Sequence, residues 1–217
     1  MSLPTISSID RSTATGAGLL PSAPVAGLDV LSHSLRDADS VAHAVVHRLH
    51  DLGALDALVA THVVATGHEP HHVLTVSATQ VAMHELQDVL HEVGAGFDVA
   101  SILVGSDYAG PPELRAGLEA AITSHVDQTG GRVVVFPGDH LLVGTVDTHQ
   151  VTSQSDVDRV VLVTGGEVAD ARPLVTRNFL RPFWHDGDLV LHVQEAIGGT
   201  LVPFETPSPT PCCADHA

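Results

Sequence analysis

A chain of 217 residues, 44% of them hydrophobic, is long enough to bury a core as one domain with extensions or as two small domains. Its 26 acidic residues stand against nine arginines and no lysine, and the net charge of −17 excludes nucleic acid and anionic membranes as expected partners. No apolar run reaches about 18 residues, so no membrane span is expected.

Both ends of the chain have the composition of segments that do not fold alone. Residues 1–28 are rich in Ser, Thr, Gly, Ala and Pro, which predicts an extended N-terminal arm. Residues 206–217 form a Pro-rich, Cys-containing tail, because prolines at 207, 209 and 211 prevent a helix or strand from continuing. The start lacks a basic segment followed by an apolar one, and this predicts a cytoplasmic location.

Residues 29–136 are expected to form an α/β core. Helical spacing of Val41, Val45 and Leu49 predicts a helix within residues 37–60, and a second amphipathic helix is predicted over 80–96. A third helix is expected over 111–131, and strands over 71–79, 97–107 and 132–136. The order β-α-β-α-β with helical crossovers is typical of parallel strands, so a parallel core is predicted.

Residues 137–205 are expected to continue the same domain as a β-rich half. Three segments, 141–151, 158–168 and 187–205, have the character of strands separated by turn residues, with no helix between them. Short connections of this kind favour antiparallel pairing.

Polar residues follow the three strands of the predicted core. Ligands of parallel α/β sheets gather at the carboxyl ends of the strands. A hydrolase-type site could therefore use His140 as base, Asp107 or Asp139 as its orienting group or metal ligand, and Ser77 as nucleophile. The alternative is ordinary turn and capping chemistry, which places Ser, Asp and Gly after many strands.

Histidines recur on two of the predicted helices. His43, His47 and His50 share one helix face, and His84, Asp88 and His91 repeat the arrangement. Two such faces brought together could bind zinc or nickel. A face opposite an apolar stripe is also where solvated residues or a subunit contact belong, and both interpretations stay open.

Residues 171–188 combine basic and aromatic side chains. Arginine and aromatic residues are enriched in interface hot spots, which predicts a partner-binding segment, and the alternative is a loop anchored in the core by its aromatics. The candidate residues are Arg172, Arg177, Phe179, Arg181, Phe183 and Trp184.

The tail contains the only two cysteines, Cys212 and Cys213, followed by Asp215 and His216. These four side chains could bind zinc or another soft metal ion, although the set would be cramped. The alternative is that the cysteines pack as small apolar residues.

Two classes of function follow. The favoured hypothesis is a non-catalytic accessory, scaffold or shell-type subunit of a larger protein assembly, which docks through its terminal arms and its Arg/aromatic segment. Its partners would be other protein subunits, in a homo- or hetero-oligomer. The alternative is a small α/β hydrolase-type enzyme, with or without a metal ion, whose site lies at the carboxyl ends of the parallel strands.

Overall fold

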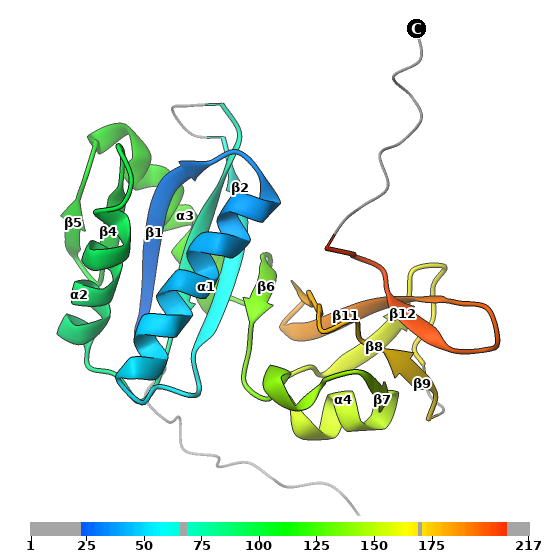
Figure 1. Ribbon diagram of the computed structural model, residues 1–217. Helices are drawn as coiled ribbons and strands as arrows, with labels where there is room; N and C mark the ends of the chain where they lie inside the picture. The colour runs from blue at the N-terminus through cyan, green and yellow to red at the C-terminus, as the bar shows by residue number, and fades with distance from the viewer. Residues whose placement is uncertain (1–22, 66–68, 169–170, 208–217) are drawn as a thin grey trace, which may run out of the picture.

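The structure is a computed structural model that describes residues 23–65, 69–168 and 171–207. It has mixed α/β content, with four α-helices and a 12-stranded, mostly antiparallel sheet within these residues. The elements form two lobes side by side, an N-terminal lobe of residues 25–135 and a C-terminal lobe of residues 136–207 (Figure 1). The predicted arm and tail lie largely in residues 1–22 and 208–217, outside the described residues.

The N-terminal lobe is a β-α-β-β-α-β unit with additional elements at its edges. Its elements are β1 (Val25–Ser32), α1 (Leu35–Asp51), β2 (Leu58–Val64), β3 (His71–Ser77), α2 (Met83–Gly94), β4 (Ser101–Val104), β5 (Asp107–Ala109), α3 (Arg115–Val126) and β6 (Arg132–Val135). The strand order is β5-β4-β1-β3-β2-β6, and each neighbouring pair is antiparallel.

The antiparallel pairing corrects the predicted parallel core. Strands β3, β4 and β6, which the helices α2 and α3 connect, do run in the same direction, because β1 is antiparallel to both β3 and β4, and β2 is antiparallel to both β3 and β6. They do not pair with one another, since β1 and β2 lie between them. Strand β1 begins within the segment expected to be an arm, and β2 begins at the end of the segment expected to be helical and continues beyond it.

Helices cover both faces of this sheet. Helices α1 and α2 pack side by side on one face, and α3 packs on the other (Figure 1). The predicted apolar stripe of α1 is buried at Val41, Val45 and Leu49, which confirms the helical period. The helix begins after Ser34, whose hydroxyl accepts a hydrogen bond from the Asp37 amide at 3.1 Å. It ends near Gly53, where a φ of 86° favours glycine.

The C-terminal lobe is β-rich, as expected. Its strands are β7 (Thr145–Asp147), β8 (Arg159–Leu162), β9 (Pro173–Val175), β10 (Phe183–His185), β11 (Asp188–Glu195) and β12 (Leu201–Pro203). Antiparallel pairs join β10 to β11, β11 to β12 and β7 to β9, while β8 pairs parallel with β11 and β9 pairs parallel with β12.

One helix of this lobe was not expected. Helix α4 (Thr148–Gln154) begins in a segment predicted as strand, 141–151, and runs past its end, so the expectation of no helix in this half is wrong. The Asp147 carboxylate caps it by accepting a hydrogen bond from the His149 amide at 2.7 Å. The Gln150 side chain in turn accepts a hydrogen bond from the Asp147 amide at 2.9 Å, so a capping box starts a short helix that hydrophobic periodicity did not indicate.

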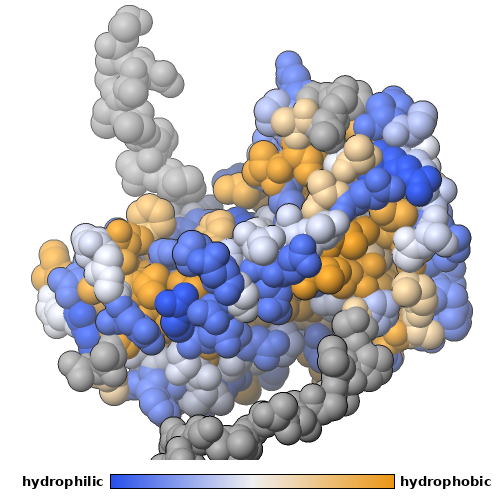
Figure 2. Space-filling view, turned by 180° about the vertical axis from the view of Figure 1, so that it is seen from behind, coloured by the Kyte–Doolittle hydropathy of each residue, from blue (hydrophilic) through white to orange (hydrophobic). Residues whose placement is uncertain are grey.

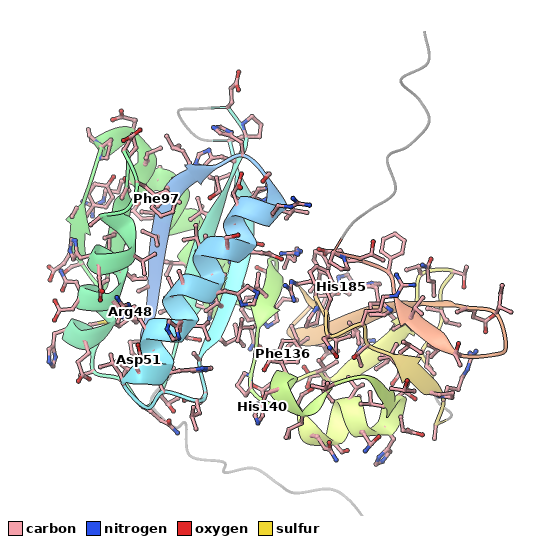
Figure 3. The ribbon with its side chains drawn as sticks, in the orientation of Figure 1. Arg48, Asp51, Phe97, Phe136, His140 and His185 are labelled. Atoms are coloured by element: carbon pink, nitrogen blue, oxygen red, sulfur yellow. The ribbon has the colours of Figure 1, made fainter. Side chains whose placement is uncertain are left out.

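The two lobes share a core and one continuous sheet. Strand β10 pairs with β6 through Phe183 and Arg132, and a hydrophobic cluster joins Ala60 and Val133 to residues of the C-terminal lobe. Phe136, which directly follows β6, is 2% exposed and lies at the junction (Figure 3). Apolar surface is also present on both lobes beside the line where they meet, as seen from behind (Figure 2).

Candidate functional site

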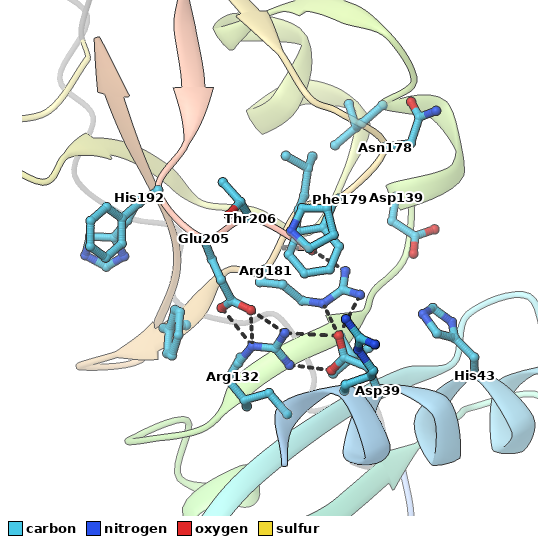
Figure 4. A pocket seen from close by; sticks show the side chains of 18 of the residues that line it. Asp39, His43, Arg132, Asp139, Asn178, Phe179, Arg181, His192, Glu205 and Thr206 are labelled. Carbon is cyan, nitrogen blue, oxygen red and sulfur yellow. Dashed lines mark hydrogen bonds and ion pairs between the residues drawn. The ribbon is translucent and has the colours of Figure 1, made fainter. Parts of the chain in front are cut away.

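A cleft of 1360 Å³ lies between the two lobes. Helix α1 and the start of β6 form its N-terminal side. Residues 139–143, residues 178–183 and the segment 204–207 after β12 form its C-terminal side (Figure 4). The cleft therefore depends on elements from widely separated parts of the chain.

Four charged side chains form a network on the floor of the cleft. Arg132 donates to Asp39 through Nη1–Oδ1 at 2.5 Å and Nη2–Oδ2 at 3.1 Å, and its Nε lies 2.8 Å from both carboxylate oxygens of Glu205. Arg181 donates to Asp39 Oδ2 from Nε at 3.2 Å and from Nη2 at 3.0 Å. Two arginines and two carboxylates thus link the lobes (Figure 4).

Interactions within the network favour the charged forms of Asp39 and Arg132 despite their burial. Burial opposes the charged form of Asp39, yet the hydrogen bond from Arg132 and the charges of both arginines outweigh it and hold the pKa of this carboxyl below its usual value. Burial acts against the charge of Arg132 as well, but hydrogen bonds to Glu205 and Asp39 raise the pKa of this guanidinium. Burial lowers the pKa of Arg181, whose guanidinium stays protonated in proteins.

Two further titratable groups line the cleft near Arg181. Burial raises the pKa of Asp139. Burial, together with the charge of Arg181, lowers the pKa of His43. Both shifts favour the uncharged form of the side chain. The cleft therefore contains a carboxyl group with a raised pKa and an imidazole with a lowered pKa.

Apolar side chains stand exposed around the cleft. They are Leu35, Val143, Val163, Phe183 and Phe204, each between 37% and 59% exposed. Phe179 also lines the cleft, and its ring lies beneath the Arg181 guanidinium, 4.0 Å from ring centre to Cζ. Exposed apolar side chains that gather on one surface mark sites of interaction more often than scattered ones do.

The four predicted catalytic residues do not meet. Asp139 and His140 line the cleft, with 3.9 Å between His140 Nδ1 and Asp139 Oδ1, while the His140 side chain is 71% exposed (Figure 3). Asp107 begins β5 at the opposite edge of the lobe, five strand positions from β6, which is about 24 Å at ~4.8 Å per strand. Ser77 Oγ lies 3.1 Å from His125 Nε2 and contributes to a different group of side chains.

The predicted partner-binding segment divides into three parts. Phe179, Arg181 and Phe183 line the cleft. Trp184 is 5% exposed and packs between the lobes. Outside the cleft lining, Arg172 donates to Glu195 and to the carbonyl of Gly199, and Arg177 is exposed with a φ of 56°.

A buried histidine network lies beneath Trp184. Thr75 Oγ1 is 2.8 Å from His62 Nε2 and 2.8 Å from His125 Nδ1. Burial lowers the pKa of His62 to about 4 and that of His125 to about 3, so both rings are neutral at pH 7. This network joins β2, β3 and α3, and Trp184 covers it from the C-terminal lobe.

Several residues of the cleft were not candidates from the sequence. Asp39 fell within the predicted helix of residues 37–60 without a role of its own, and Arg132 and Glu205 were not singled out. One signal in the sequence could have identified Arg132. It is one of few arginines and begins an otherwise apolar strand at 132–135, and a buried arginine needs a carboxylate partner. His43 belonged to a predicted histidine face on α1; all three of its histidines are exposed, and only His43 lines the cleft.

The predicted metal ligands Cys212, Cys213, Asp215 and His216 lie outside the described residues. Within residues 23–65, 69–168 and 171–207, no group of three or more His, Cys, Asp or Glu side chains has a geometry that could hold a metal ion. In the same part of the chain, no helix combines the length and the apolar character needed to cross a membrane.

Comparisons with known proteins identify no relative from which the role of the cleft could be inferred. No protein-family model, curated protein or solved structure matches this chain.

Proposed function

We propose that this chain is a non-catalytic subunit that binds an apolar segment of a partner protein in the cleft between its lobes. The observation that carries the proposal is the group of five exposed apolar side chains around the cleft, three of which are Val143, Phe183 and Phe204. Burying such side chains against a partner is favourable at about 25 cal/mol per Å² of apolar surface. Part of the predicted Arg/aromatic segment supports the same interpretation, since it lines this cleft.

The size and charge of the cleft favour a protein segment over a small molecule. Its volume of 1360 Å³ exceeds the range of about 300–1,000 Å³ that is usual for small-ligand pockets. On the floor, each of the two buried arginines already has a carboxylate partner. Apolar contact, rather than recognition of a highly charged ligand, is therefore the main interaction that this surface offers.

Overall charge favours a partner that differs from this chain. Two copies, each with a formal charge of −17, would repel one another, and the repulsion weakens self-association at low ionic strength. We therefore place a second type of protein in the cleft. Docking through residues 1–22 and 208–217 stays a prediction, because these residues lie outside the described part of the chain.

Site-specific cross-linking in cells tests the proposal. A photo-reactive amino acid at position 143, where Val143 is 59% exposed beside the cleft, should capture one discrete partner. Val126 provides the matched control position, because it is also 59% exposed but lies on α3, outside the cleft lining. The partner captured at 143 should then bind the purified chain, and Phe204→Asp should weaken that binding while Val126→Asp should not. Equal capture at the two positions, or equal binding by both variants, contradicts the proposal.

A second candidate is hydrolase-type chemistry in the same cleft. Asp139 and His43 favour it, because a raised carboxyl pKa and a lowered imidazole pKa are the displacements expected of an acid and a base. His140 would then be an exposed neighbour, and Ser77 and Asp107 would take no part. Ester hydrolysis measured with p-nitrophenyl acetate should be lost in Asp139→Asn and in His43→Gln but kept in Ser77→Ala. Activity that survives in both cleft variants, or is absent from the unaltered chain, removes this candidate.

A further inference from the structure

Glu205 differs from the other members of the charged network. Its side chain is 24% exposed, whereas those of Arg132, Arg181 and Asp39 are 6%, 7% and 14% exposed. Glu205 also comes from the short segment that follows β12, while Asp39 and Arg132 come from a helix and a central strand. It is therefore the member that could leave the network with the least disturbance of the fold.

Departure of Glu205 would leave an unsatisfied positive site. Arg132 and Arg181 would then share one carboxylate, that of Asp39, so the floor of the cleft would carry a net charge of about +1. The Nε and Nη2 edge of Arg132 now faces both oxygens of Glu205; without them, Nε would lack an acceptor and Nη2 would keep only Asp39 Oδ2. A guanidinium edge of this kind binds a carboxylate through two parallel hydrogen bonds.

The surroundings of Glu205 suit an acid with an apolar body. A second hollow of 470 Å³ lies beside the main cleft, and both hollows are lined by Leu35, Arg132, Phe183 and Glu205. Glu205 thus lines both of these partly apolar concavities. A carboxylate bound there in its place would leave the rest of its molecule against Leu35, Phe183 and Phe204, all of which are exposed.

We propose that Glu205 occupies a carboxylate-binding site on Arg132, and that the partner segment supplies a carboxylate that takes its place. This inference rests on the proposed function and adds to it the chemistry that the partner must present. The exchange replaces one carboxylate by another, so it keeps the buried guanidinium paired throughout. The Glu205 side chain then acts as an internal carboxylate that the correct ligand displaces from Arg132, while Phe204 stays in the cleft lining.

Three short peptides test the exchange by NMR titration. The first is acetyl-Ala-Val-Leu-Phe with a free C-terminal carboxylate, the second is its C-terminal amide, and the third is the amide extended by one glutamate. Glu205→Gln should bind the first or the third peptide at least about tenfold more tightly than the unaltered chain does, with no change for the neutral amide. Glu195→Gln is the matched control, since Glu195 also pairs with an arginine, Arg172, but lies outside the cleft lining.

The unaltered chain supplies a second measurement that needs no variant. A carboxylate peptide should shift the backbone amide signals of Glu205 and Thr206, and the neutral amide peptide should leave them in place. The preferred peptide also identifies whether the carboxylate is C-terminal or belongs to a side chain. Equal affinities of Glu205→Gln for charged and neutral peptides would overturn the inference while leaving apolar docking intact. If no peptide shifts the signal of Val143 or its cleft neighbours, the proposed function fails as well.

Discussion

The ring of Trp184 meets the ring of His125 edge to face, with their centroids 4.7 Å apart at an interplanar angle of 65°. The same indole also stacks over His62, at a centroid distance of 6.5 Å. Trp184 belongs to β10 of the C-terminal lobe, whereas both histidines belong to the N-terminal lobe. One aromatic side chain of the C-terminal lobe therefore contacts two buried histidines of the N-terminal lobe and helps to join the lobes.

Truncation of Trp184 should be strongly destabilising. Trp184→Ala is expected to lower the free energy of unfolding by about 3–5 kcal/mol, because it leaves a cavity between the lobes and exposes the histidine network. Urea denaturation followed by circular dichroism measures this difference. Phe204→Ala, at a position 58% exposed, should change the free energy by no more than about 0.5 kcal/mol. Similar losses in both variants would show that Trp184 does not organise the lobe interface.

Stability should fall as the pH is lowered from about 6.5 towards about 3. His62 and His125 have lowered pKa values in the folded chain, so between these limits the unfolded state binds more protons than the folded state. Their contribution is therefore complete above pH 6.5 and is lost progressively on acidification. A pKa of about 4 for His62 corresponds to roughly 3 kcal/mol. Urea titrations at pH 7 and pH 5 measure the loss, and His125→Gln should reduce it; a loss of the same size in that variant would assign the effect to other groups.

Removal of Asp39 should lower the free energy of unfolding, because two buried guanidinium groups would lose a carboxylate partner. Asp39→Ala is expected to destabilise the fold by about 3–5 kcal/mol, since Arg181 would lose its carboxylate partner and Arg132 would keep only Glu205. The control is Asp51→Ala, which removes an exposed ion pair with Arg48 at 3.6 Å and should change stability by less than about 1 kcal/mol (Figure 3). Thermal unfolding of the two variants side by side checks the contrast, and equal shifts in melting temperature would mean that the network adds nothing beyond a surface ion pair.

Gly131 should resist substitution for two separate reasons. Its φ of 120° is unfavourable for other residues, and a Cβ atom there would lie 2.6 Å from Cε1 of His62. Gly131→Ala is therefore expected to be more destabilising, by about 1–3 kcal/mol, than Gly53→Ala, where φ is 86° but nothing lies within 4 Å of the added atom. Chemical denaturation of both variants measures the difference. A Gly53 variant as unstable as the Gly131 variant would show that backbone strain alone accounts for the effect.

The sequence predicted the elements better than their arrangement. The apolar stripe at Val41, Val45 and Leu49 identified α1, and the segments at β3, β4 and β6 were recognised as strands with a common direction. Strand β1 was divided between an expected arm and the core, and the first residues of β2 were assigned to an expected helix, because Ala, Gly and Val leave local periodicity ambiguous. Because β1 and β2 lie between the predicted strands, the sheet is antiparallel and not parallel as expected.

The candidate site was only partly accessible from the sequence. Asp139 and His140 were candidates because they follow a strand, and they do line the cleft. Phe179, Arg181 and Phe183 were candidates because arginine and aromatic residues cluster there, and they also line it. Ser77 and Asp107 follow strands just as Asp139 does, yet strand order separates them, and no local pattern reports strand order.

The amino-acid sequence by itself determined the helices of the first lobe, the β-rich character of the second, and the net charge of −17, since periodicity and composition are local properties of a chain. Tertiary structure alone decided which charges meet. Arg132 bonds Asp39 across 93 residues and Glu205 across 73 residues, and Trp184 reaches a histidine network in the other lobe. Such contacts form only when two distant segments are buried side by side, and the packing of the strands is what places them together.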